Sequence, residues 1–136
     1  MAIEVYLVFN GNCREAVEFY SEVFETPIQP ILTYGEGNIP GDFTDEEKNL
    51  VMHTFLNISG SRIMFSDSYP GEPVNIGQNV SITILSNDMD EIKAQFNRLK
   101  EGGTVEMDLQ ETFWSKCYGS LIDKFGVSWQ FSHVDE

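Results

Sequence analysis

The same order of elements can be read twice along this 136-residue chain, and this repeat limits the fold more than any other feature. Each half begins with a strand, continues with an amphipathic helix and ends with three strands. The first repeat covers residues 1–70 and the second covers residues 78–136. The segment at residues 67–77, where the two repeats join, contains two prolines and two glycines, which predicts a connecting loop. We therefore expect one α+β domain over residues 1–136, made of paired βαβββ repeats.

The first repeat is predicted from its apolar runs and turn residues. Apolar β-forming residues at 5–9 predict a strand, and Asn12 followed by Glu15 predicts the capped start of a helix. Pro27 and Pro30 end that helix. Further strands are expected at residues 28–34, 50–58 and 62–66, and the acidic run at residues 45–47 is expected to form a solvated helical turn in a long polar loop.

The second repeat is predicted in the same way. Residues 78–85 predict a strand, and Asp88 with Glu91 predicts the capped start of a helix that ends at Gly102-Gly103. Strands are expected at residues 104–109, 116–122 and 127–133. Along each strand, alternation separates an apolar face, which the helices must cover, from a mixed and mostly polar face that suits a concave, solvent-filled cup.

The charge of the chain argues against two classes of partner. Eight Lys and Arg face 22 Asp and Glu, so the formal net charge is −14. Phosphate backbones and anionic lipid bind through clustered Lys and Arg, so we expect no nucleic acid and no membrane partner. The first residues show neither a basic region nor an apolar signal core, and the two cysteines are sparse, which predicts a cytoplasmic protein with reduced thiols.

Four segments carry a resemblance to a known family. Residues 6–13 (YLVFNGNC), 60–67 (GSRIMFSD), 111–114 (ETFW) and 123–129 (DKFGVSW) resemble PhnB-type proteins of the vicinal oxygen chelate superfamily. That superfamily includes glyoxalase I, extradiol dioxygenases, fosfomycin-resistance enzymes and bleomycin-binding proteins. The resemblance implies an eight-stranded curled mixed sheet that forms a cup, helices on its outer face, a small-molecule ligand in the cup, and a homodimer.

The resemblance also implies where a metal would bind. The superfamily's four ligand positions fall on Glu4, Met64, Ser81 and Gln130. A thioether favours soft Cu(I) and a neutral hydroxyl is a poor ligand, so we expect no tightly bound metal and no other cofactor. The alternative is a divalent metal on Glu4, His53 and Gln130, in a metal-dependent lyase or dioxygenase with an altered ligand set.

A methyltransferase activity on a quinone precursor has also been attached to this family, and the sequence does not support it. Methyl transfer from S-adenosylmethionine normally uses a doubly wound parallel sheet with a Gly-rich turn after the first strand. Here that turn is Asn10-Gly11-Asn12, and each half carries hairpins.

The expected ligand contacts come from the polar faces of the strands and from one connecting segment. They are Tyr6, His53, Met64, Ser81, Trp114 and Gln130. For the adjacent Phe113 and Trp114, one ring is expected to pack, and three roles stay open: ligand contact, subunit interface and core. Cys13 is expected to be a packed thiol, with a nucleophile as the alternative, and His133 is expected to be solvated. The sequence does not decide whether the protein is an enzyme. Besides the metal-free binding protein and the metal-dependent enzyme, a third hypothesis is a dimer whose aromatic residues serve assembly alone.

Overall fold

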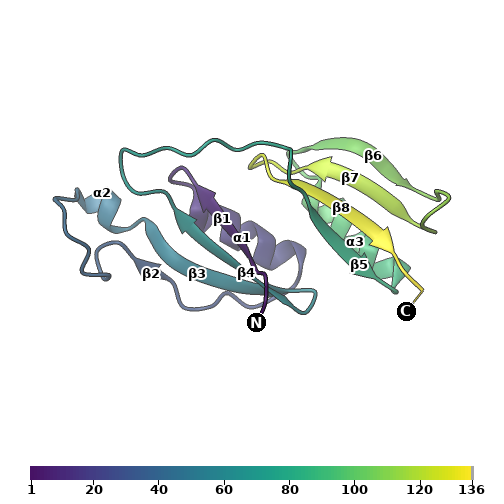
Figure 1. The fold of residues 1–136 in the computed structure, drawn as a ribbon, viewed down its shortest axis with the longest axis horizontal. Helices are drawn as coiled ribbons and strands as arrows, with labels where there is room; N and C mark the ends of the chain where they lie inside the picture. Colours follow the sequence, from purple (N-terminus) through teal and green to yellow (C-terminus); the bar gives the residue numbers. More distant parts are fainter. Residues whose placement is uncertain (136) are drawn as a thin grey trace. The chain divides into compact units, whose positions relative to one another are not determined.

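A computed structural model describes residues 1–135 of the chain. The chain divides into two compact units, one over Met1–Asn75 and one that begins at Ile76. Each unit contains a strand, a long helix and three further strands, so the predicted α+β class and the βαβββ repeat are confirmed (Figure 1). Among the described residues, none of the helices has the length and apolar character needed to cross a membrane.

The first unit forms a four-stranded mixed sheet. Its elements are β1 (Val5–Phe9), α1 (Cys13–Val23), β2 (Leu32–Thr33), α2 (Asp45–Lys48), β3 (Val51–Ile58) and β4 (Ser61–Asp67). The strand order is β1-β4-β3-β2, with β1 parallel to β4 and the other neighbours antiparallel. Ser59 and Gly60 both have positive φ angles, 50° and 81°, as the tight β3–β4 hairpin turn requires.

The second unit repeats this topology. Its elements are β5 (Ile82–Ser86), α3 (Met89–Leu99), β6 (Thr104–Gln110), β7 (Tyr118–Ile122) and β8 (Ser128–His133). The strand order is β5-β8-β7-β6, with β5 parallel to β8. Each strand therefore has a counterpart in the first unit, and β8 corresponds to β4.

Each sheet buries one face under its own long helix (Figure 1). In the first unit the buried side chains of α1 meet those of β3 and β4, including Leu56 and Phe65. In the second unit Phe96 of α3 packs edge-on against Phe131 of β8, with 5.7 Å between ring centroids. The opposite faces carry the less buried residues of the same strands, which places the predicted ligand contacts away from the cores.

Two predicted strands were too long. The strand expected at residues 28–34 is reduced to Leu32–Thr33, because prolines at 27 and 30 lack the N–H that a strand ladder needs. The strand expected at residues 78–85 begins only at Ile82, because its partner β8 begins at Ser128 and offers no residue beside 78–80. Val80, which alternation along the predicted strand would place on its apolar face, is therefore 73% exposed.

The helix starts were predicted in part. Asp88 caps α3 as expected, since its side chain accepts the backbone N–H groups of Asp90 and Glu91. Asn12 makes no side-chain capping bond to α1. Instead, Asp67 at the end of β4 accepts the N–H of Cys13 at 2.9 Å. The acidic helical turn is confirmed as α2.

Candidate functional site

The open face of the first sheet brings three predicted contacts together. The hydroxyl of Tyr6 lies 3.4 Å from Nδ1 of His53, and the two ring centroids are 5.9 Å apart. Met64 on β4 stands in register between Tyr6 on β1 and Phe55 on β3. We call these residues, Tyr6, His53, Met64 and Phe55, the first-unit cluster. It offers a mainly apolar surface with one imidazole.

Glu4 belongs to a different interaction on this unit. Both of its carboxylate oxygens accept hydrogen bonds from Arg62, at 2.7 Å from Nε and 2.6 Å from Nη2. The hydrogen bonds from Arg62 lower the pKa of Glu4, and they raise the pKa of the guanidinium in return. The Glu4 carboxylate is therefore occupied by a bidentate ion pair.

The open face of the second sheet carries a chain of hydrogen bonds. Gln130 on β8 donates from Nε2 to Oγ of Ser81 at 2.6 Å, and its Oε1 accepts the hydroxyl of Tyr118 on β7. Thr83 and Ser120 lie beside Gln130 in register on the two neighbouring strands. We call Ser81, Gln130 and Tyr118 the amide chain. Because its two ends are engaged, the side chain of Gln130 is held in one orientation.

Tyr118 was missing from the predicted contacts. It shares the open face with Ser120 and Ile122 by simple alternation along β7. That pattern could have identified it, since a tyrosine two residues from a serine on a polar face is placed to hydrogen-bond across strands. The bond to Gln130 depends on the register of β7 with β8, which pairs Tyr118 with Ser132 and Ser120 with Gln130.

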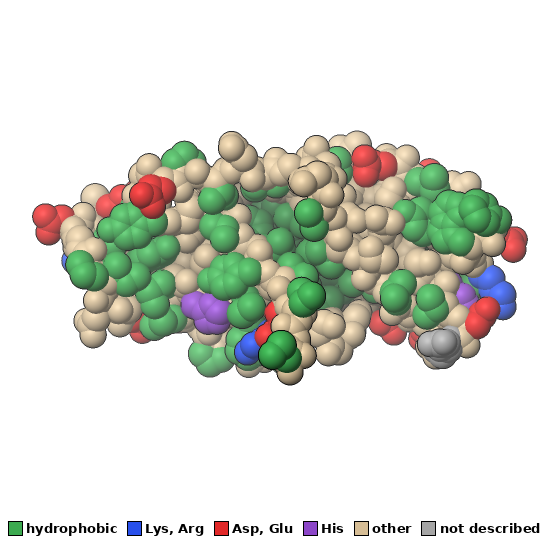
Figure 2. Space-filling model, viewed as in Figure 1, with side chains coloured by type: hydrophobic (Ala, Val, Ile, Leu, Met, Phe, Trp, Pro, Cys, Tyr) green, Lys and Arg blue, Asp and Glu red, His purple; other side chains and the backbone are tan. Residues whose placement is uncertain are grey.

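The segment between β6 and β7 adds an aromatic ladder to the amide chain. Trp114 packs edge-on against Tyr118 with ring centroids 5.2 Å apart, and Phe113 packs edge-on against Trp114 at 4.7 Å. Phe113 is 97% exposed and Trp114 is 54% exposed. The expectation that one ring packs into the core is therefore wrong, and Figure 2 shows the exposed apolar side chains over this segment.

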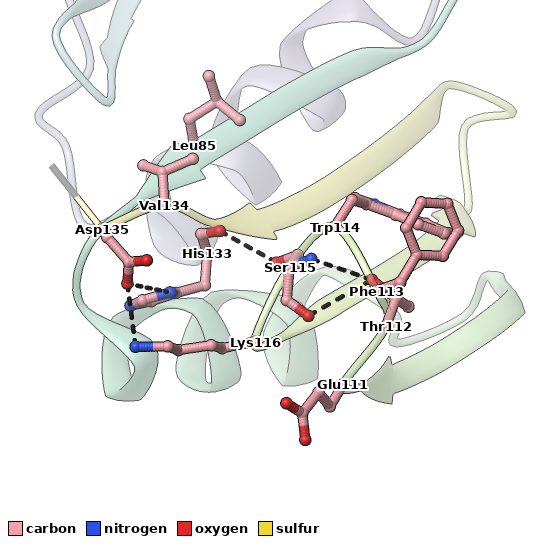
Figure 3. Close-up of a pocket in the computed structure, with 10 residues that line it drawn as sticks. All are labelled: Leu85, Glu111, Thr112, Phe113, Trp114, Ser115, Lys116, His133, Val134 and Asp135. Carbon is pink, nitrogen blue, oxygen red and sulfur yellow. Dashed lines mark hydrogen bonds and ion pairs between the residues drawn. The ribbon is translucent and has the colours of Figure 1, made fainter.

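A pocket of about 650 Å³ lies beside Trp114 (Figure 3). Its walls come from the end of β5, the segment before β7 and the residues that follow β8. His133 lines it with a side chain that is only 10% exposed, so the prediction of a solvated His133 is wrong. Its Nε2 lies 3.2 Å from the backbone carbonyl of Asn87, which holds the ring in place.

The residues at the superfamily's metal positions do not fit a divalent ion. Glu4 already gives both oxygens to Arg62, and the Oε1 of Gln130 already accepts the Tyr118 hydroxyl. Met64 supplies a thioether, which suits soft monovalent copper rather than a hard divalent cation. Within residues 1–135, His, Cys, Asp and Glu side chains form no group of three or more that could hold a metal ion.

The alternative metal set, Glu4, His53 and Gln130, does not fit a divalent ion either. His53 faces Tyr6, and Glu4 faces Arg62, so the two first-unit members are turned to other partners. Gln130 belongs to the second unit and is engaged there at both ends.

Cys13 does not have the environment of a reactive thiol. Its side chain is fully buried, and burial raises its pKa strongly. The nearby carboxylate of Asp67 raises it further, while Arg14 only partly opposes the change. The thiol therefore stays protonated near neutral pH, as a packed core residue does.

The chain matches known proteins along nearly its whole length. The family model described as 3-demethylubiquinone-9 3-methyltransferase matches residues 1–132. Protein YjdN of Escherichia coli K12 is 30% identical over 146 residues, which cover all of this chain and 97% of YjdN.

Solved structures extend the likeness to the fold. Protein PA1353 from Pseudomonas aeruginosa is 34% identical with a TM-score of 0.86, covering 98% of this chain and 97% of that one. A Bacillus cereus PhnB protein, described as a putative 3-demethylubiquinone-9 3-methyltransferase, is 30% identical with a TM-score of 0.79, covering 98% and 100%.

A more distant structure shares the fold alone. The fosfomycin resistance protein FosX from Listeria monocytogenes is 12% identical with a TM-score of 0.65, covering 98% of this chain and 93% of that one. Together with the matched family model and the two repeated βαβββ units, these relatives identify the chain as a member of the PhnB-like family, with the fold of the vicinal oxygen chelate superfamily.

Proposed function

We propose that this protein binds a small, partly apolar organic molecule without the help of a tightly bound metal. The observation that carries the proposal is the amide chain beside a half-exposed Trp114 on the second unit. A fixed polar group next to an exposed aromatic wall is typical of small-molecule sites, in which a few polar atoms orient a largely apolar ligand.

The hydrogen-bond inventory of the amide chain indicates what the ligand presents. The Tyr118 hydroxyl hydrogen is used on Gln130, and one amide hydrogen of Gln130 is used on Ser81. The Ser81 hydroxyl hydrogen and the second amide hydrogen of Gln130 are then left to meet a ligand. Two neighbouring donors without a positive charge suit a neutral acceptor, such as the oxygen of a carbonyl group.

The first-unit cluster supplies a second set of proposed contacts. Tyr6, His53 and Met64 present two rings and a flexible thioether on an open sheet face. Thioether side chains adapt to irregular apolar shapes, and aromatic rings stack on apolar or planar groups. Taken by itself, this face of the first unit is expected to contact apolar groups of a small molecule.

Neither methyl transfer nor metal-dependent chemistry is part of this proposal. Each unit consists of a strand, a helix and a hairpin-containing sheet, and the first strand-to-helix turn holds a single glycine, Gly11. This arrangement lacks the glycine-rich turn at which doubly wound folds bind nucleotides. At the metal positions, Glu4, Ser81 and Gln130 are hydrogen-bonded to other partners, and Met64 offers a thioether.

A ligand screen with tryptophan fluorescence tests the proposal. Trp129 is fully buried and donates to Asp123, whereas Trp114 is half exposed, so a ligand-induced change in emission is expected to come from Trp114. We expect compounds that raise the melting temperature to change this emission as well. Trp114→Ala should weaken their binding about thirtyfold, or about 2 kcal/mol, the size typical of a central aromatic contact.

Two controls make that screen decisive. Phe43→Ala removes a ring that packs on Tyr69 in the first unit, whereas the amide chain belongs to the second, and should leave the affinity unchanged. Each hit is measured with a chelator and again with added Mn²⁺, and equal affinity is expected in both. Hits that bind only with metal, or that bind Trp114→Ala as tightly as the natural protein, would contradict the proposal.

We also propose that the protein forms a homodimer. Strands β1 and β2 are the edges of the first sheet, and β5 and β6 are the edges of the second. Unpaired strand edges and a 97% exposed Phe113 are features that proteins commonly cover by association. Light scattering at micromolar concentration should give twice the chain mass of 15.5 kDa, and a monomer mass would contradict the proposal.

A further inference from the structure

The pocket beside Trp114 combines exposed apolar side chains with one lysine. Leu85 and Trp114 are 59% and 54% exposed, and they offer apolar surface to its interior. Lys116, His133 and Asp135 lie together, away from Trp114 (Figure 3). None of the residues of the amide chain lines this pocket, so the two sites share Trp114 alone. Its volume, about 650 Å³, lies within the range of small-molecule sites.

Lys116 and His133 both face a single carboxylate oxygen. Lys116 Nζ lies 3.1 Å from Oδ1 of Asp135, and His133 Nδ1 lies 3.9 Å from the same atom. Nε2 of His133 donates to the Asn87 carbonyl, so in the neutral ring Nδ1 is an acceptor and makes no hydrogen bond to the carboxylate, and Lys116 is the group that holds it. The pocket therefore contains a preformed place for one carboxylate.

Asp135 fills that place only loosely. Its side chain is 73% exposed, and Lys116 is 62% exposed, so their ion pair is weak in water. The backbone that leads to it is fixed by the bond from Val134 N–H to the Ser86 carbonyl, at 2.9 Å. The side chain of Asp135 can thus leave Lys116 without disturbing β8. Figure 3 shows that the other pocket carboxylate, Glu111, points away from this pair.

We propose that this pocket binds a small apolar carboxylate, and that Asp135 occupies the position of the ligand's carboxylate when no ligand is bound. On binding, the ligand's carboxylate replaces Asp135 beside Lys116 and His133, and its apolar part lies on Trp114 and Leu85. The exchange keeps one negative charge beside the Lys116 ammonium. This is why a chain with a net charge of −14 can hold an anion at this point.

Two matched probes test this inference on the full chain. 2-Naphthoate carries a carboxylate, and 2-naphthamide has the same ring with a neutral amide. Titration calorimetry should show tighter binding of 2-naphthoate. Asp135→Asn should strengthen 2-naphthoate binding about threefold to fivefold, as expected for removing a competing exposed ion pair, and should leave 2-naphthamide unchanged. Lys116→Gln should weaken 2-naphthoate binding at least about tenfold and should abolish the gain from Asp135→Asn.

Two further variants separate this site from general charge effects and from the proposed ligand site. Asp108→Asn makes the same charge change at an exposed position of β6 and should not alter 2-naphthoate affinity. Gln130→Leu breaks the amide chain and should also leave it unchanged, whatever becomes of the proposed function. The inference is overturned if Asp135→Asn has no effect, if Asp108→Asn gives an equal gain, or if Lys116→Gln binds 2-naphthoate normally.

Discussion

Asp123→Ala is expected to lower the free energy of unfolding by about 3–5 kcal/mol. The carboxylate is 3% exposed and accepts three hydrogen bonds within the β7–β8 turn. Oδ1 accepts from the backbone N–H groups of Phe125 and Val127, at 2.8 and 3.1 Å, and Oδ2 accepts from the indole of Trp129 at 2.8 Å. Alanine would leave these donors without this acceptor, one of them on the fully buried Trp129. Urea unfolding followed by circular dichroism measures the loss.

Two further variants test this prediction, one at the same position and one at an exposed carboxylate. Asp123→Asn keeps one carbonyl oxygen for the two backbone groups but turns an amide NH₂ towards the indole N–H, so it should cost less than alanine and still more than about 1 kcal/mol. Asp108→Ala removes an exposed carboxylate of the same unit and should change stability by less than about 0.5 kcal/mol. Equal stability of Asp123→Ala and Asp108→Ala would mean that the turn does not depend on this carboxylate.

The repeat could be predicted because its signals are local. Each turn is marked by residues that the chain needs there, such as Ser59-Gly60 with two positive φ angles. The helices have apolar stripes of the correct period, and Asp88 caps α3 through residues two and three positions away. The strand predicted at residues 28–34 was too long because its prolines cannot take part in a strand ladder. The strand predicted at residues 78–85 was too long because a strand ends where its partner ends. That limit is set by pairing across the sheet.

In the candidate site, the sequence predicted which face of a strand a residue occupies, but not which residues meet across strands. The period of two correctly placed Tyr6 and Met64 on the open face of their strands. It could not show that Gln130 would lie between Ser81 and Tyr118, because those contacts depend on the registers of three strands. The same is true of Glu4 and Arg62, which are 58 residues apart and meet through the parallel pairing of β1 with β4.

The prediction for Phe113 and Trp114 failed for a different reason. Two adjacent aromatic residues on a connecting segment were expected to place one ring in the core, since burial of an aromatic ring is favourable. The core beneath the second sheet is already filled by large side chains, among them Phe96, Trp129 and Phe131. The two rings pack on each other and on Tyr118 instead, and their exposure is what makes this segment a candidate for binding.

Asp67→Ala is expected to lower the free energy of unfolding by about 2–4 kcal/mol, because this carboxylate replaces the missing cap of α1. It is 2% exposed and lies at the end of β4. Oδ1 accepts the N–H of Cys13 at the start of α1, and Oδ2 accepts the N–H of Val51 at the start of β3, each at 2.9 Å. One side chain thus joins three elements, and its loss would leave two buried donors without that acceptor.

The control for this prediction lies in the same unit. Asp42→Ala removes an exposed carboxylate and should change stability by less than about 0.5 kcal/mol in the same urea titration. A second measurement follows from the charge of Asp67, which helps to raise the pKa of Cys13. In Asp67→Asn this pKa should fall but stay above its ordinary value, because burial is the larger cause. A native Asp67→Asn protein whose Cys13 reacts with a thiol reagent at neutral pH as fast as an exposed cysteine would contradict this account.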